Sequence, residues 1–75
     1  MDKETLQKLI SRRIIQIREE KGISQSELGA LCNFEKSNMS RIESGRISPS
    51  LITLYKISLA LNVDFHELFN LEINK

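Results

Sequence analysis

The chain has 75 residues, of which 40% are hydrophobic and 28% charged, with a formal net charge of +1. A chain of this length forms one domain and buries only roughly 60–65% of its unfolded surface, which disfavours an enzyme cleft of usual size. Its apolar runs are too short to span a membrane, and residues 1–10 lack the apolar stretch of a secretion signal. We therefore expect a cytoplasmic protein with a single domain over residues 1–75 and no membrane association.

Two helices are predicted before residue 33. Asp2 is a suitable N-cap for the first helix, which ends at Gly22 because glycine adopts the left-handed conformation of a helix terminus. The second helix starts after Ser24, since Ser24 and Glu27 have the spacing of a capping box. The inward residues of the first helix recur at helical spacing: Leu6, Leu9, Ile10, Ile14 and Ile17.

Residues 25–44 predict two short helices joined by a sharp turn. The turn falls at Asn33, because asparagine enters the left-handed region at low cost, and Gly29 allows the helices to cross closely. The third helix begins near Glu35 or Lys36, where glutamate is a poor N-cap, and ends at Gly45. Inward positions in this stretch are Leu28, Leu31, Cys32, Met39 and Ile42. Cys32, the single cysteine, is expected to be a small core hydrophobe.

Two further helices are predicted after residue 49. Ser50 can cap the fourth helix, which ends at Asn62, and Asp64 with Glu67 gives a box-like start to a short fifth helix over residues 65–70. The inner stripe of the fourth helix is Leu51, Leu54, Ile57, Ser58 and Leu61. Residues 71–75 alternate apolar and polar side chains, so this tail either adds a strand or frays. The predicted fold is all-α, a bundle of five helices.

One face of the third helix is polar, as major-groove recognition of DNA requires. Lys36 and Arg41 are donors suited to guanine, and Ser37 and Ser40 are short donor-acceptors. Amides at the start of the second helix form a natural phosphate site. The candidate phosphate-binding residues are Ser24, Gln25, Asn38, Ser44, Arg46 and Ser48. Considered without the surrounding pattern, Lys36 and Arg41 are also consistent with charged surface side chains that have no specific function.

Residues 18–61 resemble the Cro/C1-type helix-turn-helix family, which includes phage repressors and restriction-modification controllers. The resemblance rests on ordered motifs: Arg18 before EEKGISQ, then Glu27-Leu28-Gly29, MSRIESG over residues 39–45, PSL over 49–51, and Ala60-Leu61. It implies a lambda-repressor-like bundle whose third helix enters the major groove, with the protein acting as a homodimer on two half-sites. It also implies base contacts by Lys36, Ser37 and Arg41, a phosphate contact by Gln25, and an ion pair between Arg18 and Glu43.

The C-terminal segment has more large apolar residues than one short helix can bury. Phe65 and Leu68 are expected to close the core. The candidate dimer surface is Phe65, Phe69, Leu71 and Ile73. The alternative is that the tail folds back onto the first helix. His66 has no second histidine or cysteine partner, so a surface position is favoured over a metal site.

These observations predict a sequence-specific regulator that binds double-stranded DNA, a repressor or controller acting as a homodimer. An enzyme is not supported, because the single cysteine is expected in the core and the single histidine on the surface, so the sequence offers no nucleophile–base pair and no metal set. No cofactor, metal or small-molecule ligand is expected. The alternative is a protein-interaction module, antitoxin-like or an adaptor, that keeps the same bundle.

Overall fold

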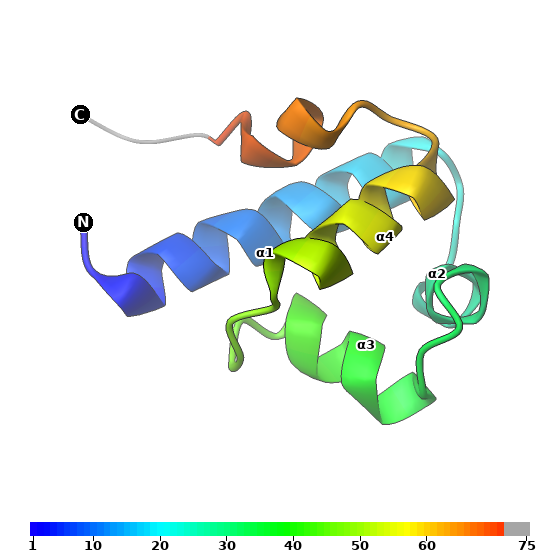
Figure 1. Cartoon of the computed structure of the whole chain (residues 1–75), viewed down its shortest axis with the longest axis horizontal. Helices are drawn as coiled ribbons and strands as arrows, with labels where there is room; N and C mark the ends of the chain where they lie inside the picture. Colours follow the sequence, from blue (N-terminus) through cyan, green and yellow to red (C-terminus); the bar gives the residue numbers. More distant parts are fainter. Residues whose placement is uncertain (72–75) are drawn as a thin grey trace.

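Four α-helices and a short 3-10 helix follow one another along the chain in the computed structural model, which describes residues 1–71. They are α1 (Lys3–Glu20), α2 (Gln25–Leu31), α3 (Lys36–Glu43), α4 (Leu51–Leu61) and the 3-10 helix η1 (Phe65–Phe69). The long helix α1 packs against α3 on one side and η1 on the other, while α2 packs against both α3 and α4 (Figure 1). No helix of the described part of the chain is long and apolar enough to cross a membrane.

Local capping sets where these helices begin. Asp2 Oδ1 accepts from the Thr5 amide at 2.8 Å, and hydrogen bonds from Thr5 lower the pKa of Asp2. Ser24 and Glu27 form the predicted capping box, with Ser24 Oγ accepting from the Glu27 amide at 3.0 Å. Ser50 Oγ accepts from the Thr53 amide at 3.1 Å. The predicted caps of the first, second and fourth helices are therefore confirmed.

Left-handed residues end the helices or join them. Asn33 has φ 58° between α2 and α3, as the sequence predicts, and Asn62, the predicted end of the fourth helix, has φ 56° after α4. Gly22 and Gly45 have φ 68° and 75° after α1 and α3. These four left-handed residues let consecutive helices change direction around one core.

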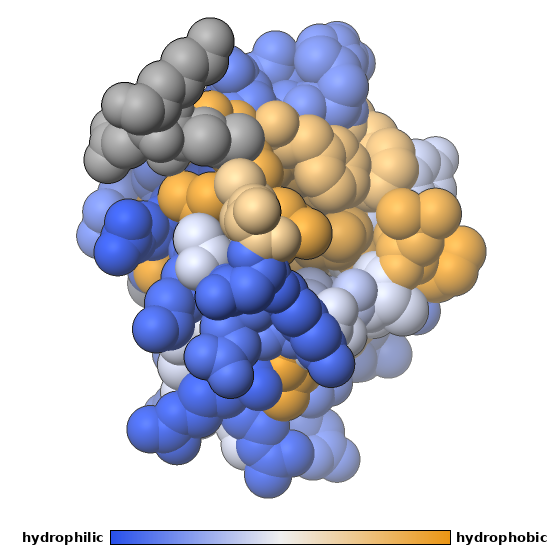
Figure 2. Space-filling view, turned by 90° about the vertical axis from the view of Figure 1, so that its left-hand side faces the viewer, coloured by the Kyte–Doolittle hydropathy of each residue, from blue (hydrophilic) through white to orange (hydrophobic). Residues whose placement is uncertain are grey.

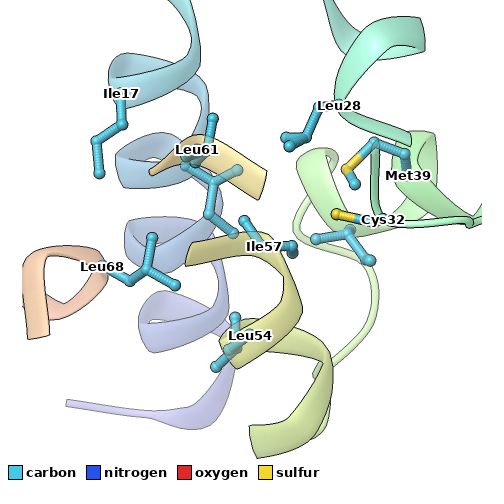
Figure 3. Packing of buried hydrophobic residues seen from close by; sticks show 10 residues of the cluster. Ile17, Leu28, Cys32, Met39, Leu54, Ile57, Leu61 and Leu68 are labelled. Atoms are coloured by element: carbon cyan, nitrogen blue, oxygen red, sulfur yellow. The ribbon is translucent and has the colours of Figure 1, made fainter. Parts of the chain in front are cut away.

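The core lies where the helices meet (Figure 3). Its buried apolar residues are Ile14, Ile17, Leu28, Cys32, Met39, Ile42, Leu54, Ile57, Leu61 and Leu68. Cys32 is buried as predicted, and burial raises the pKa of its thiol. Leu68 is fully buried and Phe65 is half-buried against the core, so both close it as expected.

Three residues predicted to face inward are exposed. Leu31 is 61% exposed because Leu28, Gly29 and Cys32 form the buried side of the seven-residue α2. Leu51, at the first position of α4, is 66% exposed, and Leu6 in the second turn of α1 is 42% exposed. Both of these lie near a helix end, beyond the region where the other elements pack.

The predicted fifth α-helix is a 3-10 helix, and its box-like start is absent. Asp64 makes no side-chain cap hydrogen bond. The carboxylate of Glu67 instead accepts from Arg13 Nη2 at 3.0 Å, and the Glu67 carbonyl accepts from Arg13 Nε at 2.7 Å. Arg13 thereby holds η1 against α1. Leu71 is half-buried and outside any strand, whereas Ile73 and the rest of the proposed tail strand lie outside the described residues.

Candidate nucleic-acid interface

Helix α3 has one buried side and one exposed side. Met39, Ile42 and Glu43 are buried. The exposed side carries all four candidate base-reading residues, Lys36, Ser37, Ser40 and Arg41. The structure therefore brings these four side chains together on one solvent-facing surface.

The first turn of α3 has no side-chain cap. Glu35 occupies the N-cap position with extended backbone, φ −64° and ψ 147°, but its carboxylate makes no cap hydrogen bond. Its carboxylate forms no ion pair with Lys36, nor with any other residue that the structure describes. The predicted weak cap is confirmed, and a carboxylate remains exposed beside the polar face of α3.

The last turn of α3 is fixed by a buried ion pair. Arg18 Nε donates to Glu43 Oε2 at 2.8 Å and Arg18 Nη2 to Glu43 Oε1 at 3.0 Å, with side chains only 13% and 3% exposed. Arg18 Nη1 also donates to the Ile23 carbonyl at 2.9 Å. Gln25 Nε2 donates to Glu43 Oε1 at 3.1 Å. The network joins α1 and the start of α2 to the end of α3.

The candidate phosphate-binding residues lie around both ends of α3. At the beginning of α2, the Ser24 hydroxyl caps the helix while Gln25 is half-buried. Gln25 and Lys36 line one recess of about 150 Å³ between α2 and α3. Past the end of α3, Ser44 Oγ donates to the Arg41 carbonyl at 2.8 Å. The remaining candidates, Asn38, Arg46 and Ser48, are exposed.

The arrangement of α2 across α3, joined by the Asn33 turn, is that of a helix-turn-helix, and the helix-turn-helix family HTH_3 matches residues 14–68. The chain belongs to this Cro/C1-type family. The match runs from the buried half of α1 to η1, so it includes the whole core together with the α2–α3 unit. The family is one of DNA-binding transcriptional regulators.

Individual relatives agree with this assignment. The chain is 38% identical over 63 residues to an uncharacterized HTH-type transcriptional regulator, y4dJ, of Sinorhizobium fredii, covering 84% of this chain and 82% of y4dJ. It is 41% identical over 63 residues to the transcriptional regulator SinR of Bacillus subtilis, covering 83% of this chain and 57% of SinR. The structure resembles the restriction-modification controller protein C.AhdI of Aeromonas hydrophila, with TM-score 0.83 and 29% identity over 87% of this chain and 98% of C.AhdI.

Two exposed surfaces of this helix-turn-helix protein are not apparent from the motif. Lys8 and Arg12 of α1 lie beside the turn after α3. Separately, α4 exposes a second apolar side made of Leu51, Ile52, Tyr55 and Leu59. A signal for the second surface exists in the sequence, because α4 (LITLYKISLAL) is apolar around most of its circumference and a small domain cannot bury all of it. Lys8 and Arg12 have the i, i+4 spacing of one helix face. The sequence around them does not predict that this face lies beside the turn after α3.

Proposed function

We propose that this protein is a sequence-specific transcriptional regulator that inserts α3 into the major groove of double-stranded DNA. The observation that carries the proposal is the exposed polar side of α3, positioned by the buried pair between Arg18 and Glu43. A helix in the major groove needs a polar face held rigidly, because each base contact depends on short donor–acceptor distances. The named relatives, which are transcriptional regulators and a controller protein, support this reading.

The residues divide into two groups in the proposed complex. Lys36, Ser37, Ser40 and Arg41 contact base edges, with Lys36 and Arg41 donating to guanine O6 and N7. The second group fixes the position of the protein by contacting phosphates, which carry no sequence information directly. This group consists of Ser24, Gln25, Asn38, Ser44, Arg46 and Ser48. Binding of this kind requires neither a cofactor nor catalysis, and we expect it to take place in the cytoplasm.

Selection from random duplexes at fixed salt tests the proposal. Wild type is expected to enrich a two-fold symmetric site, and Lys36→Ala with Arg41→Ala should reduce its preference for that site over an unrelated duplex by roughly 10- to 100-fold or more. The matched control is Lys21→Ala with Lys56→Ala, which removes two exposed charges outside α3 and should leave the preference intact. Equal preference in wild type and the Lys36/Arg41 variant would overturn the assigned face.

We also propose that the protein acts as a homodimer through an apolar surface on α4 and η1. Four exposed residues of α4 form this surface together with Phe65 and Phe69: Leu51, Ile52, Tyr55 and Leu59. The Tyr55 and Phe65 rings meet edge to face at 5.9 Å between centroids, and Phe65 and Phe69 do so at 5.1 Å, so the surface is continuous between the two elements. Figure 2 shows apolar side chains gathered in the half of the molecule that contains α4 and η1.

A second copy is the occupant that suits this surface best. A small domain with a large exposed apolar area gains stability by covering it, and a two-fold interface places the same patch on both partners. Binding to two half-sites one turn of DNA apart requires the two copies of α3 to lie about 34 Å apart. Leu71 follows this surface in the sequence and belongs to the proposed interface, whereas the other tail candidate, Ile73, lies outside the described residues.

Two exposed leucines provide a matched test of the dimer. Leu59→Lys and Leu31→Lys each place a charge at a side chain that is 61% exposed, but only Leu59 belongs to the proposed surface. Sedimentation equilibrium should show a monomer for Leu59→Lys and a dimer for Leu31→Lys. A dimer of unchanged affinity in Leu59→Lys would exclude this surface. If wild type is a monomer that selects no duplex, the interaction-module alternative takes precedence.

Within this proposal, repression by covering a promoter is the simplest mode of action. A dimer occupying two half-sites physically blocks polymerase without any additional domain. The structural likeness to a restriction-modification controller protein supports a regulatory role for this chain. Transcription from a promoter containing the selected site should fall when the protein is added, and an increase would identify an activator.

A further inference from the structure

Two shallow recesses lie on either side of Lys8, between the first half of α1 and the turn after α3. One has a volume of about 420 Å³ and the other about 220 Å³. The larger is lined by Lys3, Glu4, Gln7, Lys8, Gly45 and Arg46. The smaller is lined by Lys8, Ser11, Arg12, Glu43 and Ser44. Figure 2 looks at this end of the molecule, where hydrophilic side chains cover the lower part of the view.

Direct contacts hold α1 and the end of α3 in this arrangement. Ser11 is buried, and its Oγ donates to the Ile42 carbonyl at 2.7 Å. Gly45 is so close to α1 that an added Cβ would lie 3.2 Å from Lys8 Cγ and 3.4 Å from Lys8 Cα. The stem of Lys8 therefore packs on the turn while its ammonium group remains in solvent. These contacts fix Lys8 and Ser11 against the end of α3 and the turn that carries Gly45.

The recesses are rich in positive charge. Four cationic side chains line them against two carboxylates, and one of those, Glu43, is already paired with Arg18. Lys8, Arg12 and Arg46 form no ion pair with any residue in the described range 1–71. A protein with a net charge of only +1 thus gathers, beside its proposed DNA-reading helix, cations that form no ion pair within that range. The remaining acid, Glu4, lines only the larger recess and is absent from the one that Lys8 and Arg12 share.

The length of α3 explains why cations at this end would matter. Eight residues span about 12 Å, close to the width of the major groove, so the two ends of α3 approach the two bordering strands. Gln25 and Lys36 are near the first end. Ser44 and Arg46 follow the second end, on the same recesses as Lys8 and Arg12.

We propose that Lys8 and Arg12 of α1, together with Arg46, form a second phosphate-binding site that holds the DNA strand opposite to the one at Gln25. The site binds phosphodiester groups of duplex DNA and carries no sequence preference. This inference rests on the proposed function, because it requires α3 in the major groove. It extends the DNA contact surface from the helix-turn-helix onto the first helix of the domain.

The test compares Lys8→Ala with Arg12→Ala against Lys21→Ala with Lys56→Ala, which removes the same charge elsewhere. Dissociation constants are measured over a series of salt concentrations for the selected duplex and for an unrelated duplex of equal length. The Lys8/Arg12 variant should bind both duplexes about tenfold more weakly, with the slope of log affinity against log salt reduced by about 2. The ratio between the two duplexes should stay as in wild type.

The outcomes separate this inference from the proposed function. A wild-type protein that prefers no duplex overturns the proposed function, whatever the effect of Lys8. A wild type that prefers its selected duplex, with unchanged affinity and salt slope in the Lys8/Arg12 variant, overturns only the second site. Cations near the C-terminal end of α3 also stabilise the helix by offsetting its dipole. If the Lys8/Arg12 variant has a lower midpoint of thermal unfolding but an unchanged salt slope, the two residues act only on stability, and the second phosphate site is overturned. Lys8→Gln with Arg12→Gln keeps most of each stem and provides the same test if the alanine variant unfolds.

Discussion

The two ends of α3 are held in opposite ways. Its last turn is fixed by tertiary contacts, with Glu43 paired to Arg18 and the Ile42 carbonyl accepting from Ser11. Its first turn begins at Glu35, whose side chain caps nothing. A helix of eight residues is not stable by itself, so α3 depends on contacts with other elements more than on its own sequence. In the proposed complex the end without a side-chain cap carries Lys36 and Ser37, two of the residues proposed to contact bases.

Removal of Arg18, which holds the last turn of α3, should cause the largest loss of stability. Arg18→Ala leaves the Glu43 carboxylate buried without its partner, which should lower the free energy of unfolding by about 3–5 kcal/mol. Urea denaturation followed by circular dichroism measures this loss. Arg18→Met with Glu43→Leu removes both charges and should cost much less. If the single and double variants lose equal stability, unpaired charge is not the cause.

A methyl group at Gly45 should have the next largest effect, at the same end of α3. Gly45→Ala forces a left-handed backbone on an L-residue, at a cost of about 1–2 kcal/mol, and presses its Cβ against the stem of Lys8. Gly22→Ala is the control, because Gly22 is also left-handed but has nothing within 4 Å of the added Cβ. The difference between the two variants in urea denaturation isolates the contact with Lys8. Equal losses would mean that the stem moves away freely.

A side-chain cap at residue 35 should stabilise the first turn of α3 and so make its two ends more alike. Glu35→Ser places a hydroxyl where the extended backbone already suits an N-cap, so the free energy of unfolding should rise by about 1 kcal/mol. The thermal unfolding midpoint reports this gain. The variant should also bind duplex DNA more tightly, since it removes a carboxylate beside the proposed groove-facing side. Ser24→Ala is the opposite control and should lose about 1 kcal/mol, because Ser24 caps α2.

A methyl group at Gly29 should have the smallest effect, and its sign should be opposite to that at Gly45. An added Cβ would lie 3.6 Å from Met39 Cβ, an ordinary van der Waals distance, so the close crossing of α2 and α3 does not require glycine. Gly29→Ala should raise the free energy of unfolding by about 0.5–1 kcal/mol through the entropy of the unfolded chain. Differential scanning calorimetry detects a change of this size. A loss of stability would mean that the two helices have no freedom to accommodate the methyl group.

Features encoded within a few residues were predictable from the sequence. The capping box of Ser24 and Glu27, the Asn33 turn and the weak cap at Glu35 each depend on neighbours along the chain. The helical repeat of apolar residues likewise predicts most of the core. The exposed positions of Leu31 and Leu51 were missed because, in a short helix, periodicity does not determine which edge of the apolar stripe meets the other helices.

The start of η1 illustrates the same limit. Asp64 and Glu67 have capping-box spacing, but Glu67 binds Arg13, 54 positions away in the sequence. A charged hydrogen bond to a half-buried guanidinium competes successfully with a local cap. Spacing alone cannot reveal this, because Arg13 is brought to Glu67 only when α1 and η1 pack together.

By itself, the sequence determined the four α-helices, the caps of α1, α2 and α4, the Asn33 turn and the polar side of α3, because backbone conformation and helical periodicity act between near neighbours. The tertiary structure decided which charged and apolar groups meet. It joined Gln25 to the Arg18–Glu43 pair, placed Lys8 on Gly45, and left one side of α4 apolar and exposed. These pairings depend on how whole helices pack around one core, and that packing is settled by the burial of all their apolar residues at once.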